Sequence, residues 1–355
     1  MCKFPLVGYW TVDGLKVTSK FKFNERFGKI DYSFVGSEMV LRRQHFFSKD
    51  YELFIHPYTG ELMRPMQIPC GQCIECRLAR SREWADRMEM EKEFWADDWC
   101  YFLTLTYDND HLPTDHRFPT VPSLEPDDVR LFMDRLRSYF RDNFKFTGMR
   151  FYLCGEYGTK THRPHYHIIA FNCPVYLFKD IVHLFNNFQG DPFYISKRLD
   201  DIWGKGFVCF SNVTWDTCCY TARYVTKKLY KSDLTDIDGT DYELPYLPEF
   251  SRASNRPGIG APYWASHADK IIENRGIQLK SGRFVPIPRY FKKLLKASDE
   301  ETFYRLQSES LDYANLRYDQ LISQCPHAEE PSYLLAVEHD MKKNVYSKLI
   351  RSLDI

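Results

Sequence analysis

Short runs of apolar, β-branched and aromatic residues in the middle of the chain predict four β-strands. They span residues 100–107, 149–157, 165–171 and 207–213. The turn-forming stretch "GTKTHRP" separates the second run from the third, so we expect these two strands to pair as a hairpin.

Four longer segments carry helix-forming residues or apolar residues three and four positions apart, which predicts helices. They span residues 77–95, 123–144, 175–188 and 216–230. In the second of these, Ser123 is the expected N-cap and Pro126 is expected in the first turn.

From residue 100 onward the predicted elements follow the order β-α-β-β-α-β-α. The first six form the split βαβ pattern of an α+β, ferredoxin-like fold with helices packed on an antiparallel sheet. We expect three segments: an N-terminal cysteine-containing segment with a helix (1–98), a central domain (99–232) and a C-terminal extension (233–355).

Composition and charge limit the classes of function. The chain has 355 residues, of which 44% are hydrophobic and 16% aromatic, as in globular proteins. No apolar run approaches the ~18 residues of a membrane helix, and the first residues lack the layout of a signal peptide, so we expect no membrane partner. Eleven cysteines, an odd count, argue against a disulfide framework.

Charge is balanced over the whole chain, with 48 basic and 48 acidic residues, so there is no global signature of a nucleic-acid-binding protein. Two stretches differ from this average. Residues 223–231 and 280–296 are basic and contain no acidic residue. Each stretch is either a solvated face or part of a nucleic-acid interface.

The first chemical motif is His165-Tyr166-His167 at the start of the third predicted strand. Side chains alternate along a strand, so His165 and His167 share one face. Glu156, near the end of the paired strand, is expected to lie opposite them. Two imidazoles and a carboxylate with open positions suit Mg²⁺ or Mn²⁺. The alternative is two satisfied histidines at a strand edge and a surface carboxylate.

The last predicted helix carries a second motif. Tyr220 and Tyr224 are four residues apart and therefore share one helix face, and Lys227 follows on the same side. A lysine in this place could hold a phosphate or lower the pKa of a phenol. The alternative is that one or both tyrosines are core aromatics of the helix.

These motifs together resemble a known family. "FLTLTY", "GEYG" with "RPHYHIIAF", and "YTARYVTKK" are similar to the three ordered motifs of HUH-superfamily replication endonucleases. "PCGQCIECRLARSREWADR", "SNRPGIG" and "PIPRYF" resemble, more narrowly, rolling-circle replication initiators of gokushovirus-type microviruses. The resemblance covers about residues 70–295.

The resemblance implies a role for each matching residue. Glu156, His165 and His167 match the metal ligands of the family, and Tyr220 and Tyr224 match its nucleophiles. Lys227 matches the lysine that follows the tyrosines in the family motif. We also expect three basic residues close to these motifs to contact DNA: Arg163, Arg223 and Lys228.

The implied activity is nicking of single-stranded origin DNA. Attack by a tyrosine gives a 5′-phosphotyrosine and a free 3′-hydroxyl, and a later joining step releases circles. The chain has no phosphate-binding G-x-x-x-x-G-K-[ST] loop, so we expect a host helicase and polymerase as partners in the bacterial cytoplasm. Alternatives are an HUH transposase or relaxase, and a non-catalytic single-stranded DNA-binding phage protein.

A final motif is the C-x₂-C-x₂-C run formed by Cys70, Cys73 and Cys76. A tetrahedral structural zinc requires a fourth ligand. Because relatives often begin Met-Cys, Cys2 is the expected one, with Cys100 and His56 as alternatives. Free thiols and an iron–sulfur cluster are the other readings of the run.

Overall fold

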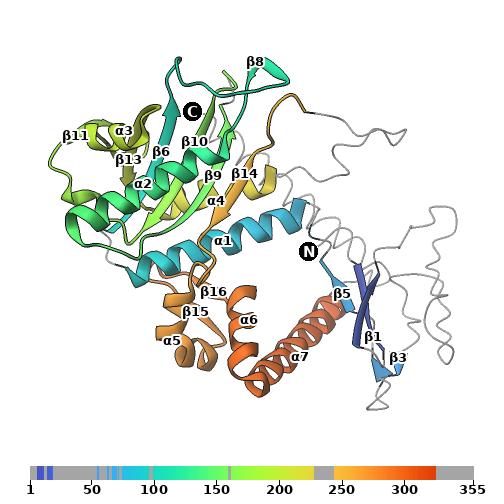
Figure 1. Ribbon diagram of the computed structural model, residues 1–355. Coiled ribbons are helices and arrows are strands. Elements are labelled where there is room, and N and C mark those ends of the chain that lie inside the picture. Colours follow the sequence, from blue (N-terminus) through green and yellow to red (C-terminus); the bar gives the residue numbers. More distant parts are fainter. Residues whose placement is uncertain are drawn as a thin grey trace. The chain divides into compact units, whose positions relative to one another are not determined.

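We describe the protein from a computed structural model, shown in Figure 1. The structure describes residues 6–11, 14–18, 54–55, 62–63, 66–69, 71, 74–95, 99–158, 161–227 and 244–324. The chain divides into two compact units. The first comprises residues 1–77 and 307–355, and the second comprises residues 78–306.

The described part of the first unit consists mainly of short strands. Its sheet has the antiparallel order β2-β1-β5, and a further pair joins β3 to β4. The strands are β1 (Leu6–Thr11), β2 (Gly14–Thr18), β3 (Phe54–Ile55), β4 (Leu62–Met63) and β5 (Met66–Ile68). Helix α7 (Glu300–Gln324) begins in the second unit and ends in the first.

The second unit is built on an antiparallel sheet of seven strands in the order β11-β12-β13-β6-β10-β9-β14. The strands are β6 (Cys100–Tyr107), β9 (Arg150–Tyr157), β10 (Pro164–Phe171), β11 (Ile181–Asn186), β12 (Pro192–Ser196), β13 (Gly206–Asn212) and β14 (Phe250–Ala253). A small hairpin, β7 (Thr114–Asp115) with β8 (Phe118–Pro122), follows β6.

One face of this sheet is covered by α2 (Pro126–Phe144) and α3 (Lys197–Trp203). The apolar residues of α2 recur at helical spacing and bury Phe132, Leu136 and Phe140 against the sheet. Trp203 of α3 is fully buried in the same core. We call this the closed face.

The opposite face packs against α1 (Ile74–Phe94) and α4 (Trp215–Lys227). Its core includes Met88 of α1, Ala222 of α4 and Phe102 of β6. Helix α4 contacts β10, β9 and β14, which is one end of the strand order. We call this the site face.

The second unit ends with α5 (Ala261–Glu273), the hairpin β15 (Gly276–Gln278) with β16 (Phe284–Pro286), and α6 (Arg289–Ser298). Buried polar contacts fasten this region to α1 and β9. Glu91 forms an ion pair with Arg150 and accepts from the backbone N–H of Gly260, while Arg87 donates to the carbonyl of Ile259. Strand β14 and this region lie in the part of the sequence expected to be a C-terminal extension.

The prediction of an α+β fold with a large antiparallel sheet is confirmed, as are its four strands. The predicted helix at 175–188 is wrong: this segment forms a short 3₁₀ helix (Val175–Leu177) and then strand β11. Its apolar spacing also suits a strand that begins with the β-branched pair Ile181 and Val182 and reaches β12 through a turn containing Gly190.

The predicted N-cap of α2 is wrong by two residues. Glu125 is the cap, and its side chain accepts from the N–H of Asp127. Ser123 instead accepts from the N–H of Leu247, near β14. Among the helices that the structure describes, none has the length and apolar character needed to cross a membrane.

Candidate active site

The hairpin of β9 and β10 brings a carboxylate and two histidines together on the site face. In the strand register His165 lies opposite Glu156, and His167 follows two residues along on the same face. Glu156 and His167 are buried, and His165 is half-buried. A set of polar side chains in this position requires partners for each of its atoms.

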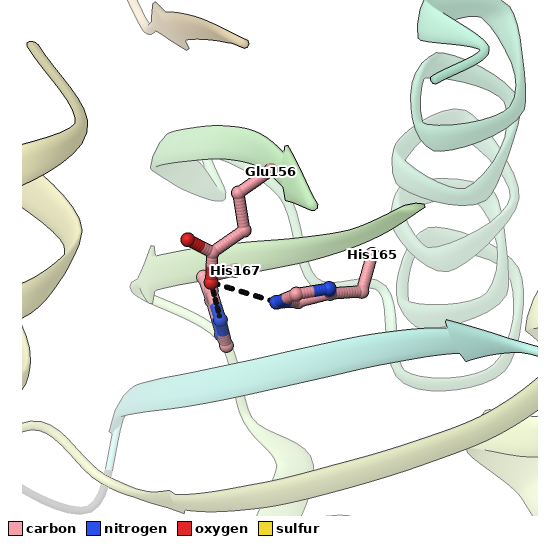
Figure 2. Close-up of side chains that lie close together, drawn as sticks. All are labelled: Glu156, His165 and His167. Carbon is pink, nitrogen blue, oxygen red and sulfur yellow. Dashed lines mark hydrogen bonds and ion pairs between the residues drawn. The ribbon is translucent and has the colours of Figure 1, made fainter. Parts of the chain in front are cut away.

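The three side chains converge on one oxygen atom. Nε2 of His165 and Nε2 of His167 each lie 2.7 Å from Oε1 of Glu156, as Figure 2 shows. One ligand atom from each residue lies within 4.8 Å of the others. Among the residues that the structure describes, this is the cluster of three or more potential metal ligands that meets that limit.

The outer nitrogen of each ring is held by a second contact. Nδ1 of His165 lies 3.2 Å from the carbonyl of Arg163, and Nδ1 of His167 lies 2.9 Å from the hydroxyl of Thr104. A carbonyl only accepts, so Nδ1 of His165 is the donor. A neutral His165 therefore turns the lone pair of Nε2 toward the Glu156 oxygen.

Two acceptors at this distance repel each other unless a cation lies between them. Either a proton or a metal ion can supply the positive charge. Imidazole nitrogens fixed by second contacts, together with a carboxylate, are a common donor set for divalent metals. The residues present therefore fit a divalent cation.

The pKa values indicate the same stabilisation of charge. Burial acts to raise the pKa of Glu156, but hydrogen bonds from His165 and His167 outweigh it and hold the pKa far below its usual range. Burial acts to lower the pKa of His165, and the bond with Glu156 outweighs this effect and raises it. The site thus favours a carboxylate next to positive charge.

Tyr220 of α4 completes the cluster. Its hydroxyl donates to Oε1 of Glu156 at 3.0 Å and lies 3.4 Å from Nε2 of His167. Its ring meets the rings of His167 and Phe102 edge to face, with centroids 5.0 Å and 6.3 Å away. A phenol hydroxyl is therefore held against the group that would bind the metal.

The other predicted residues of α4 are described less fully. The backbones of Tyr224 and Lys227 belong to α4, one and two turns beyond Tyr220, while their side chains lie outside the described part of the structure. Lys228 also lies outside the described residues. Arg223 is half-buried on α4.

Arg163 has contacts of its own near the site. Its guanidinium donates to the side-chain oxygen of Asn109 and to the backbone carbonyls of Tyr107 and Asp108. It thereby fastens the start of β10 to the end of β6. DNA binding by Arg163 stays a prediction.

The predicted zinc ligands are described for one residue of four. Cys76 is half-buried in the first turn of α1 and forms no disulfide. Cys2, Cys70 and Cys73 lie outside the described residues, so the zinc site stays a prediction.

The sequence reasoning missed two residues that support the histidines. Thr104 contacts His167 directly, and the ring of Phe102 stacks on the His167 ring with centroids 5.2 Å apart. In "FLTLTY" the residues 102, 104 and 106 share one face by alternation, and this was the available signal. What the sequence did not show was that this strand lies beside β10.

The comparisons with known proteins agree with the fold and site. Residues 100–229 match a family model described as replication-associated protein ORF2. The chain is 32% identical over 262 residues to replication-associated protein VP4 of Bdellovibrio phage phiMH2K, which covers 71% of this chain and 77% of that protein. It is 29% identical over 294 residues to replication-associated protein ORF2 of Spiroplasma virus 4, with 81% and 85% covered.

A third relative is replication-associated protein ORF4 of Chlamydia phage 1, which is 28% identical over 340 residues, with 92% of this chain and 78% of that protein covered. No solved structure matches the chain. The chain belongs to this family of replication-associated proteins, whose members found here are proteins of microvirus-type phages.

Proposed function

We propose that this protein initiates rolling-circle replication of phage DNA by nicking and rejoining single-stranded origin DNA. The observation that carries the proposal is the hydroxyl of Tyr220, held 3.0 Å from the Glu156 oxygen that both site histidines share. A nucleophile next to a three-ligand metal site is what phosphoryl transfer requires. The relatives, all replication-associated proteins, support the biological task.

The strand order supports an HUH-type, ferredoxin-like domain. The central strands follow the order β13-β6-β10-β9, and α2 connects β6 to β9 while α3 precedes β13. This is the spatial order of a split βαβ fold. It differs by the hairpin of β11 and β12, which extends the sheet at one edge.

Glu156, His165 and His167 would hold Mg²⁺ or Mn²⁺, which when bound polarises a phosphate oxygen and stabilises charge at phosphorus. Tyr220 supplies the nucleophile. Its oxygen forms a bond to phosphorus while the bond from phosphorus to the 3′-oxygen breaks. The phenol proton leaves along the hydrogen bond to Glu156, and the 3′-oxygen gains a proton to become the hydroxyl that a host polymerase extends.

Tyr224 lies one helical turn beyond Tyr220 and is the proposed second nucleophile. It would cut again while Tyr220 is still esterified, so that joining releases a circle. Lys227 would neutralise phosphate charge beside the phenols. A host helicase would separate the strands, and the reaction would take place in the host bacterial cytoplasm.

The test is formation of a covalent adduct. The protein is incubated with labelled single-stranded origin DNA and Mn²⁺ and run on a denaturing gel. The double variant Tyr220→Phe/Tyr224→Phe is expected to form no adduct yet still bind DNA, since the nearby positive charges remain. The control Tyr176→Phe changes an exposed tyrosine on the 3₁₀ helix and is expected to react normally.

Adduct formation by the double variant at the wild-type level would disprove the nuclease proposal. It would leave a single-stranded DNA-binding protein as the function. Either single variant is expected to form one adduct and to fail in releasing circles. Release of circles at the wild-type rate by a single variant would disprove the second nucleophile alone.

We also propose one structural Zn²⁺ bound by Cys70, Cys73, Cys76 and Cys2. The half-buried, reduced Cys76 at the start of α1 supports this proposal. Such a zinc contributes directly to folding, so a chelator is expected to lower the melting temperature. Elemental analysis of freshly purified protein that finds no stoichiometric zinc would contradict it.

A further inference from the structure

An exposed phenylalanine stands on an inner strand of the sheet. Phe207 of β13 is 64% exposed, although β13 pairs with β12 on one side and with β6 on the other. Its neighbour Val208 points to the closed face and is fully buried. Phe207 therefore lies on the site face, where its ring remains open to solvent.

The register places Phe207 in line with the candidate active site. Phe207 pairs with Thr106, Thr106 pairs with His165, and His165 pairs with Glu156. Adjacent strands are about 4.8 Å apart, so the backbones at Phe207 and His165 are separated by roughly 10 Å. A strand of nucleic acid with its phosphate at the histidines would reach Phe207 within one or two nucleotides.

The exposed apolar surface continues to the edge of the sheet. Val182 of β11 pairs with Ile195 of β12, and Phe185 pairs with Phe193. The rings of Phe185 and Phe193 stack with centroids 5.1 Å apart and an angle of 5° between them. Val182 is 58% exposed and Phe185 is 47% exposed.

This surface joins the site without a break. The ring of Phe193 meets that of Phe102 at 6.5 Å, and Phe102 stacks on His167. The side chains that β6, β12 and β13 place on this face are aromatic, aliphatic, hydroxyl or thiol groups, and none of them is acidic. They are Phe102, Thr104, Thr106, Phe193, Ile195, Phe207, Cys209 and Ser211.

A contiguous exposed apolar patch usually marks a binding site. Flat aromatic rings next to a phosphate-transfer site suit the bases of a single strand, because every base presents a π-face for stacking. The lack of acidic groups on the strands means that phosphates meet no repulsion from them. Continuity with the histidines favours this occupant over a protein partner.

We propose that the surface formed by Val182, Phe185, Phe193, Ile195 and Phe207 binds the bases of single-stranded DNA beside the scissile phosphate. Phe207 stacks on the base nearest the histidines, and Phe185 stacks on one nearer the sheet edge. The substrate class rests on the proposed function. The binding surface itself does not depend on the chemistry at Tyr220.

The test measures binding separately from cleavage. The full chain is titrated in EDTA against a fluorescein-labelled oligothymidylate of about 12 nucleotides, and anisotropy is followed. Phe207→Ala and Phe185→Ala are each expected to weaken binding about 5- to 150-fold, the range measured for loss of one stacked base. The slope of affinity against salt is expected to stay unchanged, since no charge is removed.

Two matched variants show that ring stacking is what matters. Phe207→Leu keeps an apolar side chain but lacks the ring and is expected to bind as weakly as Phe207→Ala, whereas Phe207→Trp is expected to bind at least as well as the wild type. Phe284→Ala removes a ring of similar exposure, 59%, from the β15–β16 hairpin and is expected to have no effect. A 2-aminopurine base in the probe is expected to be quenched by the wild type and not by Phe207→Ala.

Wild-type affinity in both Phe207→Ala and Phe185→Ala would overturn the proposal. So would sedimentation showing a wild-type dimer that Phe185→Ala converts to a monomer, since a second copy of the chain would then cover the surface. If these variants lose binding while the wild type forms no tyrosine adduct, the proposed function fails and the binding surface stands. If adduct formation is normal and the variants bind normally, the binding surface fails alone.

Discussion

The closed face and the site face of the seven-stranded sheet are built from alternate residues of the same strands, yet they differ in what covers them. On the closed face, Leu103 and Leu105 of β6 and Val208 of β13 are fully buried under α2 and α3. On the site face, the residues between and beside them are Thr104, Thr106 and Phe207, of which the first two are half-buried and the third is exposed.

This difference separates stability from chemistry within single strands. Burial of apolar surface supplies most of the favourable free energy of folding, and on β6 and β13 it lies on the closed face. The other face is then available for buried polar ligands and for open rings. Substitutions on the closed face should therefore change stability, and those on the site face should change binding.

The largest expected effect lies on the closed face. Trp203→Ala removes a fully buried ring that packs against Tyr107 and Phe132 and whose Nε1–H donates to the carbonyl of Thr106. We expect a loss of about 3–5 kcal/mol in the free energy of unfolding, measured by denaturant titration. Trp203→Phe keeps most of the packing and should lose less. Equal stability of Trp203→Ala and the wild type would contradict the comparison.

The next effect lies on the site face. His167→Ala removes one ligand of the candidate metal site, and loss of a direct ligand should exceed the 10- to 100-fold effect of losing an outer contact. We therefore expect Mn²⁺ affinity, measured by calorimetry, to fall by about 100-fold or more. His183→Ala, on the exposed side of β11, is the control. Unchanged Mn²⁺ binding by His167→Ala would remove the metal assignment.

A smaller effect is expected one contact further from the metal. Thr104→Val keeps the shape of the side chain but removes the hydroxyl 2.9 Å from Nδ1 of His167. We expect Mn²⁺ affinity to fall about 10- to 100-fold, with affinity retained in Thr104→Ser. Thr106→Val is the matched control because the hydroxyl of Thr106 contacts the carbonyl of Phe207 instead. Equal affinities in the two valine variants would show that Thr104 does not orient the histidine.

The smallest effect returns to the closed face. Glu125→Ala removes the side chain that caps α2 by accepting from the N–H of Asp127. Loss of a cap costs about 0.5–2 kcal/mol of stability, and this one should lie near the lower limit because the group is solvent-exposed. Glu125→Asp keeps an acceptor and should retain the stability. A change in Mn²⁺ affinity of either variant would show that the two faces are coupled.

Local pattern determined several features of this protein by itself. The side chains of His165 and His167 share a face because alternation along a strand is a property of the backbone, whatever packs around it. The hairpin with Glu156 followed from two strands separated by a short turn. The helical spacing of α2 likewise required an apolar face. Each of these features depends on residues close together in the chain.

Where local pattern permits two structures, contacts with distant segments decided between them. The segment 175–188 has apolar spacing that suits a helix or a strand, and pairing of β11 with β12 selected the strand. Ser123 resembles a cap, yet its hydroxyl accepts from Leu247, 124 residues away. Neither partner could be identified from the neighbouring sequence.

The sequence by itself determined which residues could share a face, and it therefore named the ligands Glu156, His165 and His167. Only the tertiary structure decided what stands opposite them. Tyr220 reaches Glu156 across 64 residues of chain because α4 crosses β9 and β10, and Thr104 reaches His167 because β6 lies beside β10. Periodicity acts within a few residues of backbone, whereas the choice of neighbouring strand and helix is made by burial of the whole core, which no short stretch of sequence specifies.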